Sequence, residues 1–123
     1  MRLITRGCIV LALAAGALTG CFSDRPEPSG PSNNPPPVSG SASLTIDNFA
    51  FVPPRITVTV GTTLTWTNRD ATLHTVSSTD GSTFDSGAFN QGQTFQFVAS
   101  TPGTYAYFCR IHPFMKGTVT VTP

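Results

Sequence analysis

Apolar and polar residues alternate along the chain from about residue 42 to its end. Ile56, Val58 and Val60 are separated by threonines, and Leu64 and Trp66 follow the same spacing. The remaining alternating pairs are Phe95 and Phe97, Tyr105 and Tyr107, and Val119 and Val121. Branched and aromatic residues at every second position are typical of strands with one buried face. Because no convincing helical period occurs in this region, we expect an all-β domain.

Turn-forming residues divide the alternating runs into short segments. These breakers are Pro53-Pro54, Gly61, Asp80-Gly81, Asn90-Gln91-Gly92 and Thr101-Pro102-Gly103. Short strands at this spacing predict an antiparallel Greek-key β-sandwich or barrel of about seven to eight strands. The pattern leaves the order of the strands open.

The first 20 residues have a different pattern. Arg2 and Arg6 precede an apolar run from Cys8 to Ala15, which is followed by small residues. The run is shorter than the roughly 20 apolar residues that a membrane-spanning helix needs. This arrangement predicts a secretory signal peptide over residues 1–20.

The signal peptide ends in Leu18-Thr19-Gly20-Cys21, which resembles the bacterial lipobox. In that signal the peptide is cut before the cysteine, and the cysteine is acylated. We therefore expect an exported bacterial lipoprotein, anchored to a membrane through lipid on Cys21 and facing the periplasm or the cell exterior. The alternative is an ordinary signal peptide in which Cys21 is incidental.

A proline-rich segment follows Cys21. It holds six of the eleven prolines, with Ser, Gly and Asn between them. Proline favours the extended polyproline II conformation, which rises about 3 Å per residue. We predict a semi-rigid linker over residues 21–41 and a folded domain over residues 42–123. A tether is favoured over a proline-rich ligand for a partner domain, because the segment directly follows the lipid-bearing cysteine.

Length and charge limit the function classes. A chain of 123 residues supports one domain. Between residues 42 and 123 there are four basic and four acidic side chains. This balance gives no indication of binding to nucleic acid or to an anionic membrane surface. We expect a monomer.

The three cysteines have separate fates. Cys8 would leave with the signal peptide and Cys21 would carry lipid, so Cys109 would remain alone and no intramolecular disulfide is expected. A free thiol in an oxidising compartment is a liability unless something occupies it. A bound metal would do so.

Cys109 is the first of several soft ligands. His112 and Met115 follow it at three-residue intervals, and the only other histidine of the chain is His74. Two histidines, a cysteine and a methionine suit copper that cycles between Cu(I) and Cu(II). Cys109 also shares the parity of Tyr107, so its thiol should point inward at the end of that strand. Zinc matches less well, because no second Cys-His pair exists and a thioether is a poor zinc ligand.

Three stretches resemble a known family. They are residues 61–70, Gly-Thr-Thr-Leu-Thr-Trp-Thr-Asn-Arg-Asp, which lead to His74; residues 101–107, Thr-Pro-Gly-Thr-Tyr-Ala-Tyr; and the loop Cys109-x-x-His112-Pro113-Phe114-Met115. In these stretches the chain resembles the cupredoxins, small blue copper proteins, and among them the amicyanins, with the plastocyanins as broader relatives. The resemblance implies that His74, Cys109 and His112 surround one type 1 copper ion in a plane, with Met115 as a weak axial ligand.

The resemblance also implies residues that support the ligands. The backbone amide of Thr75 would point at the thiolate sulfur, and Asn68 and Pro113 would lie beside the ligand segments. The family usually carries Asn at position 75, where its side chain braces the ligand loop. Thr75 departs from that pattern.

Such a site would carry single electrons between a redox donor and a redox acceptor in transient complexes. We expect His112 to be the port for the electron, surrounded by a docking patch of Leu73, Ile111, Pro113 and Phe114. An enzyme is not expected, because a copper site that binds oxygen or nitrite would need further histidines. A copper delivery or storage lipoprotein is the alternative, since it could use the same ligands.

Overall fold

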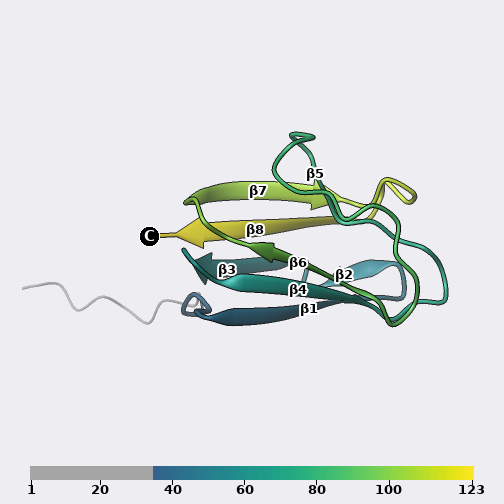
Figure 1. Cartoon of the computed structure of the whole chain (residues 1–123), viewed down its shortest axis with the longest axis horizontal. Coiled ribbons are helices and arrows are strands. Elements are labelled where there is room, and N and C mark those ends of the chain that lie inside the picture. Colours follow the sequence, from purple (N-terminus) through teal and green to yellow (C-terminus); the bar gives the residue numbers. More distant parts are fainter. Residues whose placement is uncertain (1–34) are drawn as a thin grey trace, which may run out of the picture. The chain divides into compact units, whose positions relative to one another are not determined.

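Residues 35–123 are described by the structure, which is a computed structural model (Figure 1). The strands in this range are β1 (Ser41–Asp47), β2 (Ala50–Val52), β3 (Arg55–Thr59), β4 (Thr63–Asn68), β5 (Ser77–Ser78), β6 (Thr94–Val98), β7 (Gly103–Phe108) and β8 (Lys116–Thr122). The predicted signal peptide over residues 1–20, the predicted lipid site at Cys21 and the linker up to residue 34 lie outside the described residues. No helix within residues 35–123 has the length and apolar character to cross a membrane.

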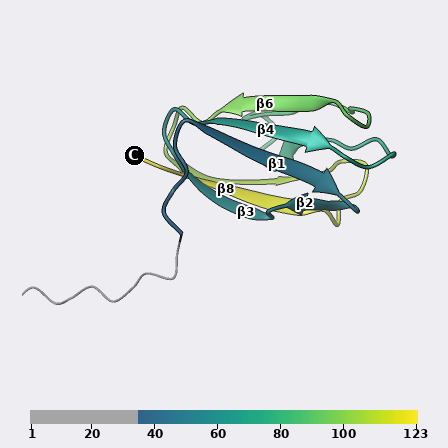
Figure 2. The ribbon, with the colours of Figure 1, turned by 90° about the horizontal axis from the view of Figure 1, so that it is seen from below.

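The strands form two sheets of four that pack face to face, which confirms the predicted all-β sandwich (Figure 1, Figure 2). One sheet has the order β2-β1-β4-β6 and the other has the order β3-β8-β7-β5. Within these sheets β1 pairs with β4, and β3 with β8, in parallel. The sheets are therefore mixed, whereas the sequence pattern suggested antiparallel pairing throughout.

The Pro53-Pro54 pair marks the point at which the chain changes from one sheet to the other. β2 pairs with β1 in the first sheet, and β3, which begins directly after the two prolines, pairs with β8 in the second. Proline has no backbone donor and cannot continue a ladder, so the pairing with β1 ends there and the chain continues into β3 of the other sheet. β4 then returns to the first sheet beside β1 and runs in the same direction as β1.

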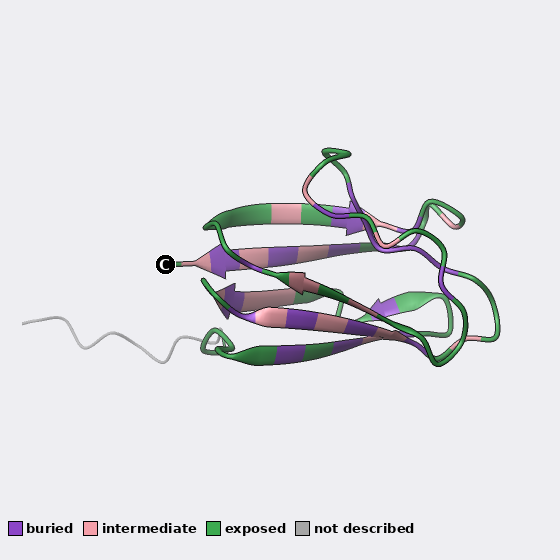
Figure 3. Ribbon diagram, in the orientation of Figure 1, coloured by how far each residue is buried: buried purple, intermediate pink, exposed green. Residues whose placement is uncertain are grey.

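The core lies between the sheets and follows the predicted alternation. Along β4 and β8, buried residues alternate with half-buried ones (Figure 3). Trp66, Tyr107 and Phe51 are the largest fully buried side chains. Trp66 Nε1 donates a hydrogen bond to Tyr107 Oη at 3.2 Å. This bond satisfies the one polar group of the indole, which would otherwise be costly to bury.

One end of the sandwich carries the predicted ligand segments. β4 ends at Asn68 and β7 ends at Phe108, one residue before Cys109. Both segments leave the sheets at the end drawn on the right in Figure 1. The start of β1, by contrast, pairs with the start of β4, because Ser41 lies opposite Thr63. The described chain therefore enters the domain at the end remote from the ligand segments.

Candidate metal centre

His74 is held in a loop that is tied to a distant part of the chain. Its backbone forms an isolated bridge with Phe89, in which Phe89 N donates to His74 O at 3.0 Å and His74 N donates to Phe89 O at 3.4 Å. The side chain of His74 is fully buried. This pairing fixes the backbone from which the imidazole projects.

Asn68 braces the same loop from inside. It is fully buried, and its Nδ2 donates to Thr72 O at 2.9 Å and to Phe89 O at 3.0 Å. Its Oδ1 accepts a hydrogen bond from Asp70 N at 2.9 Å. Asn68, which was predicted to support the ligands, thus lies close to His74 and acts on the loop backbone. A buried amide with all these bonds made is a strong constraint on the loop.

Asp70 orients the imidazole of His74. Its Oδ2 lies 2.8 Å from His74 Nε2, and the two carboxylate oxygens accept the backbone N–H groups of Asn48 and Phe49 at 2.7 and 2.9 Å. Burial raises the pKa of Asp70, but the hydrogen bonds from Phe49, Asn48 and His74 together lower this pKa by more, so the net shift is downward. An ionised carboxylate only accepts, so the proton of His74 sits on Nε2 and the lone pair of Nδ1 is free for a metal.

The second ligand segment is a tight loop from Cys109 to Met115. Cys109 N donates to Met115 O at 3.1 Å, and Met115 N donates to His112 O at 2.9 Å. Cys109 and Met115 are buried, His112 is half-buried, and Pro113 lies exposed on the outer side of the loop. The inward direction predicted for the Cys109 thiol from its parity is the one observed.

The two segments bring three donor atoms together. Cys109 Sγ lies 3.7 Å from His74 Nδ1 and 3.8 Å from His112 Nδ1. The ligand atoms of these three residues all lie within 4.8 Å of one another. Thr75 N donates to Cys109 Sγ at 3.3 Å, in the direction that the family resemblance implied.

Thr75 also braces the ligand loop, although it is shorter than the usual Asn. Its Oγ1 accepts a hydrogen bond from Arg110 N at 2.8 Å. Arg110 directly follows Cys109, so the threonine hydroxyl ties the loop to the segment that follows His74. Thr75, although it differs from the usual Asn, therefore still connects the two ligand segments through its side chain.

The chemistry of these residues fits copper. A thiol and two imidazoles whose Nδ1 atoms face it are soft and borderline donors, and Met115 adds a buried thioether at the end of the same loop. Asp70, the carboxylate nearest to the ligands, is bonded to the far nitrogen of His74, away from the thiol. Hard cations such as magnesium and calcium prefer oxygen ligands and do not match this set.

Phe49 is a functional residue that the sequence pattern did not identify. Its ring lies edge-on to both imidazoles, with centroids 5.4 Å from that of His74 and 5.1 Å from that of His112. It belongs to the two-residue turn between β1 and β2, where Asn48 and Phe49 have φ of 54° and 59°. Positive φ at both positions makes the direction of a turn side chain independent of strand parity. The only sequence signal was an aromatic residue in a short turn.

The residues of the predicted docking patch are exposed around His112. Leu73 is 42% exposed, Ile111 45% and Phe114 70%. The Phe114 ring lies near the imidazole of His112, with centroids 6.0 Å apart. These residues come from both ligand segments, so the patch covers the end of the sandwich that holds the candidate site.

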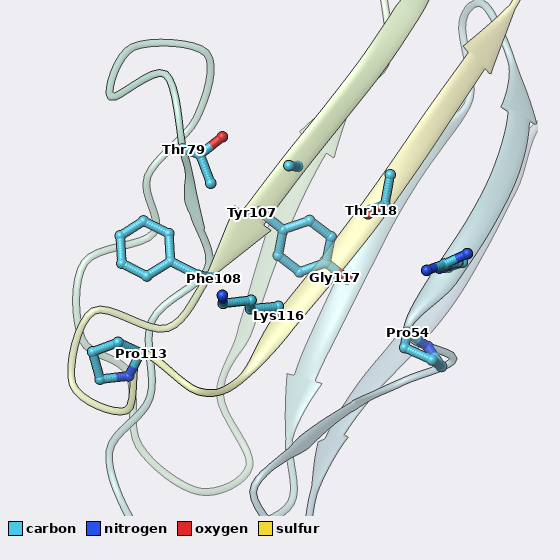
Figure 4. A pocket seen from close by; sticks show the side chains of 10 residues that line it. Pro54, Thr79, Tyr107, Phe108, Pro113, Lys116, Gly117 and Thr118 are labelled. Atoms are coloured by element: carbon cyan, nitrogen blue, oxygen red, sulfur yellow. The ribbon is translucent and has the colours of Figure 1, made fainter.

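A pocket on the second sheet is separate from the metal centre. It is lined by side chains of β3, β7 and β8, including Arg55, Phe108 and Lys116, together with Pro113 (Figure 4). None of the four predicted ligands lines it. Pro113 lies at its edge, so the pocket adjoins the ligand loop without containing the donor atoms.

Comparison with known proteins agrees with the fold and the donor set. The family model of the cupredoxin-like domain matches residues 11–121. The chain is 33% identical over 114 residues to amicyanin-alpha of Methylorubrum extorquens, which covers 89% of this chain and 85% of that protein. It is 31% identical over 125 residues to amicyanin of Paracoccus denitrificans, with 94% of both chains covered.

Solved structures show the same likeness. A Cu(I) form of a mutant amicyanin superposes with a TM-score of 0.62 at 30% identity, over 74% of this chain and 94% of that chain. A purple cupredoxin from Nitrosopumilus maritimus gives a TM-score of 0.61 at 33% identity, over 66% of this chain and 99% of the other. The strand arrangement, the converging donors and these relatives agree, and the chain belongs to the cupredoxin family.

Proposed function

We propose that the domain is a single-electron carrier that holds one type 1 copper ion through His74, Cys109 and His112, with Met115 as a weak fourth ligand. The observation that carries this proposal is the convergence of the three donor atoms within 4.8 Å of one another at one end of a cupredoxin sandwich. A copper ion bound there would supply the one-electron couple Cu(I)/Cu(II). The amicyanins among the relatives support the same assignment.

The task of the protein residues in this function is to hold the ligands still. Asp70 fixes the ring of His74, Thr75 N–H fixes the sulfur of Cys109, and the backbone bonds between Cys109, His112 and Met115 close the loop. A site whose ligands are placed by hydrogen bonds needs little rearrangement when the charge of the metal changes. Small rearrangement lowers the barrier to electron transfer.

Electrons would enter and leave through His112. Its imidazole is half-buried, whereas that of His74 is fully buried, so His112 is the ligand with access to a partner. The docking patch of Leu73, Ile111, Pro113 and Phe114 around it suits a transient complex with a redox donor or acceptor, because small apolar interfaces form and dissociate quickly.

Copper titration of the purified domain tests the proposal. Addition of Cu(II) should produce an intense visible band from thiolate-to-copper charge transfer, and Cys109→Ser should abolish it. Reduction by one electron per copper should bleach the band, and reoxidation should restore it. A colourless or labile complex would contradict the carrier and favour copper delivery or storage.

We further propose that the domain is tethered to a membrane through lipid on Cys21 and the linker over residues 21–41. The geometry of the described residues is compatible with this arrangement, since the chain enters β1 at the end remote from His112. An anchor there leaves the docking patch free to meet partners. Twenty residues of proline-rich linker would reach up to roughly 60 Å.

Fractionation of expressing bacterial cells tests the tether. The wild-type chain should sediment with membranes, and mass spectrometry should find acyl chains on Cys21 with residues 1–20 removed. Cys21→Ser should move the protein to the soluble fraction. A soluble wild-type protein with an unmodified Cys21 would refute the tether and leave the copper proposal intact.

A further inference from the structure

A ring of hydrogen bonds connects the ligand loop to the protein surface. Arg110 N donates to Thr75 Oγ1 at 2.8 Å, and Ser77 Oγ lies 3.1 Å from Thr75 Oγ1 and 2.9 Å from Asp85 Oδ1. Asp85 Oδ2 forms an ion pair with the guanidinium of Arg110 at 2.9 Å, which closes the ring. The ring therefore begins and ends on the residue that follows Cys109.

The hydroxyl of Ser77 joins the two halves of the ring. Asp85 is ionised at neutral pH, because the Gly87 backbone N–H lowers its pKa, and Ser77 and Arg110 lower it further against the effect of burial. Ser77 Oγ is the donor both to Asp85 Oδ1 and to Thr75 Oγ1, so its single proton is shared between these two acceptors. Thr75 Oγ1 therefore accepts from both Arg110 N–H and Ser77 O–H, and hydrogen bonds linked in this way strengthen one another.

Two members of the ring flank the thiol. Thr75 donates its backbone N–H to Cys109 Sγ at 3.3 Å, and its side chain holds the backbone of Arg110. Ser77 is fully buried and Thr75 nearly so, whereas the side chains of Asp85 and Arg110 are 38% and 52% exposed. The inner half of the ring is thus shielded from water, where hydrogen bonds constrain geometry most.

We propose that Ser77 and Asp85 are positioning residues for the Cys109 sulfur. They act through Thr75, because they fix the Thr75 N–H that donates to the sulfur and the Thr75 hydroxyl that accepts from Arg110 N–H. The proposal rests on the proposed function only for its effect on copper. With Asn, which the family usually has at position 75, the side chain alone can reach the loop. Thr75 is shorter, and its hydroxyl is kept in place by the hydrogen bond from Ser77 Oγ.

Amide hydrogen exchange in the metal-free protein tests the positioning directly. Ser77→Ala and Asp85→Asn should each speed exchange of the Arg110 N–H, by about ten-fold for Ser77→Ala, because local opening becomes easier when the acceptor is no longer fixed. The matched control is Ser78→Ala, which removes a buried hydroxyl from the neighbouring position of β5. Ser78 Oγ bonds to Asp80 and Phe84, away from the ligand loop.

The outcomes separate clearly. Faster Arg110 exchange in both variants and not in Ser78→Ala supports the proposal. Unchanged exchange, or an equal increase in Ser78→Ala, overturns it. Because Asp85 is partly exposed, Asp85→Asn keeps the test decisive even if Ser77→Ala fails to fold.

The copper-loaded protein provides a second readout. Loss of a well-placed N–H donor leaves more charge on the sulfur, so Ser77→Ala and Asp85→Asn should lower the reduction potential and move the charge-transfer band. Restoring the hydroxyl with Ser77→Thr should bring both values back toward wild type. If the wild type itself forms no band, the proposed function fails, and the exchange measurement still decides the role of Ser77 and Asp85.

Discussion

The imidazole of His74 is oriented by one carboxylate, and that carboxylate is itself held by the backbone of a turn far away in the sequence. Asp70 receives N–H groups from Asn48 and Phe49 and bonds to His74 Nε2. A ligand histidine with a fixed outer nitrogen has a fixed tautomer and ring angle. The precision of the site at this position therefore depends on a residue that binds no metal.

Replacement of Asp70 by Ala should weaken both the fold and the site. Three donors lose their acceptor, so the free energy of unfolding of the metal-free protein should fall by about 1–3 kcal/mol. Affinity for copper should fall about 10- to 100-fold, because His74 is no longer held. Urea denaturation and competition with a copper chelator measure the two effects. Asp47→Ala, at an exposed carboxylate of β1, is the control, and equal losses in both variants would contradict this role of Asp70.

Tyr107 makes the stability of the domain sensitive to alkaline pH. Burial raises the pKa of its hydroxyl to about 12, although the hydrogen bond from Trp66 acts in the opposite direction. A tyrosine in the unfolded chain ionises near pH 10, so above that pH the folded state holds the extra proton. The contribution is complete below about pH 10 and is lost progressively as the pH rises toward 12.

Urea unfolding of the metal-free protein at several pH values should reveal this loss. We expect the Tyr107 contribution to fall by about 1.4 kcal/mol between pH 9 and pH 11. Tyr107→Phe should remove this component, and it should lower stability at neutral pH by about 1–3 kcal/mol, since Trp66 Nε1 loses its acceptor. Tyr105→Phe leaves the buried hydroxyl in place and should retain the alkaline loss. A pH profile of Tyr107→Phe that matches the wild type would refute the assignment.

At the level of strands, the contact between β7 and β8 depends on Gly117. This residue lies opposite Tyr107 in the ladder, and a Cβ built on it would stand 2.3 Å from Tyr107 Cζ. Any larger residue must displace the buried ring, which also packs against Phe51 and Trp66. The close approach of β8 to that ring therefore requires glycine at this position.

Gly117→Ala should destabilise the domain by about 1–3 kcal/mol, as overpacking of a core does. Thermal or urea unfolding of the metal-free protein measures the effect. In a Tyr107→Leu background the same substitution should cost less, because the ring that it meets is gone. Additive costs in the double variant would show that the clash with Tyr107 is not the cause.

The strands themselves were largely predictable, and their pairing was not. Alternation marks which residues face the core, because that property is local, so Trp66, Tyr107 and Cys109 were assigned correctly to the inside. Whether two strands run parallel depends on the path between them. The switch of sheets at Pro53-Pro54 is a tertiary event, and the sequence shows only that a strand is interrupted there.

At the scale of the whole molecule, the exposed apolar residues of the predicted docking patch lie at one end, and the described chain enters β1 at the other. The docking patch surrounds His112, and Phe114 at 70% exposure is its most accessible member. We expect two copies of the domain to meet through this patch in a mixture of oxidised and reduced protein. Their electron self-exchange therefore provides a test that needs no knowledge of the natural partner.

Phe114→Asp should slow self-exchange by about ten-fold or more, because two carboxylates would face each other across a small apolar contact. Line broadening in NMR spectra of mixed redox states measures the rate. Val98→Asp is the matched control: Val98 is 52% exposed and pairs with Thr63, at the end of the sandwich remote from His112. Equal rates in Phe114→Asp and the wild type would exclude the patch as the docking site.

The donor cluster of His74, Cys109 and His112 was predictable from the sequence, and so were Asn68 and Thr75 beside it. Cys109 and His112 share one short loop, and His74 was the only other histidine, so residue type and spacing were enough. The remaining supports were not predictable. Asp70, Phe49, Ser77 and Asp85 reach the site through side-chain hydrogen bonds or through a turn with positive φ. Such contacts depend on tertiary placement, which strand periodicity does not encode.

Through the turn at Asn48 and Phe49, the hairpin of β1 and β2 helps to hold the metal ligands in place. Both of its N–H groups must stay on Asp70 for His74 to stay in place, and the Phe49 ring closes over the edges of both imidazoles. The rate of metal release should therefore follow the rate at which the hairpin of β1 and β2 opens, although these strands supply no ligand. Fluctuation of the hairpin, measured residue by residue, would set how long the domain retains its copper.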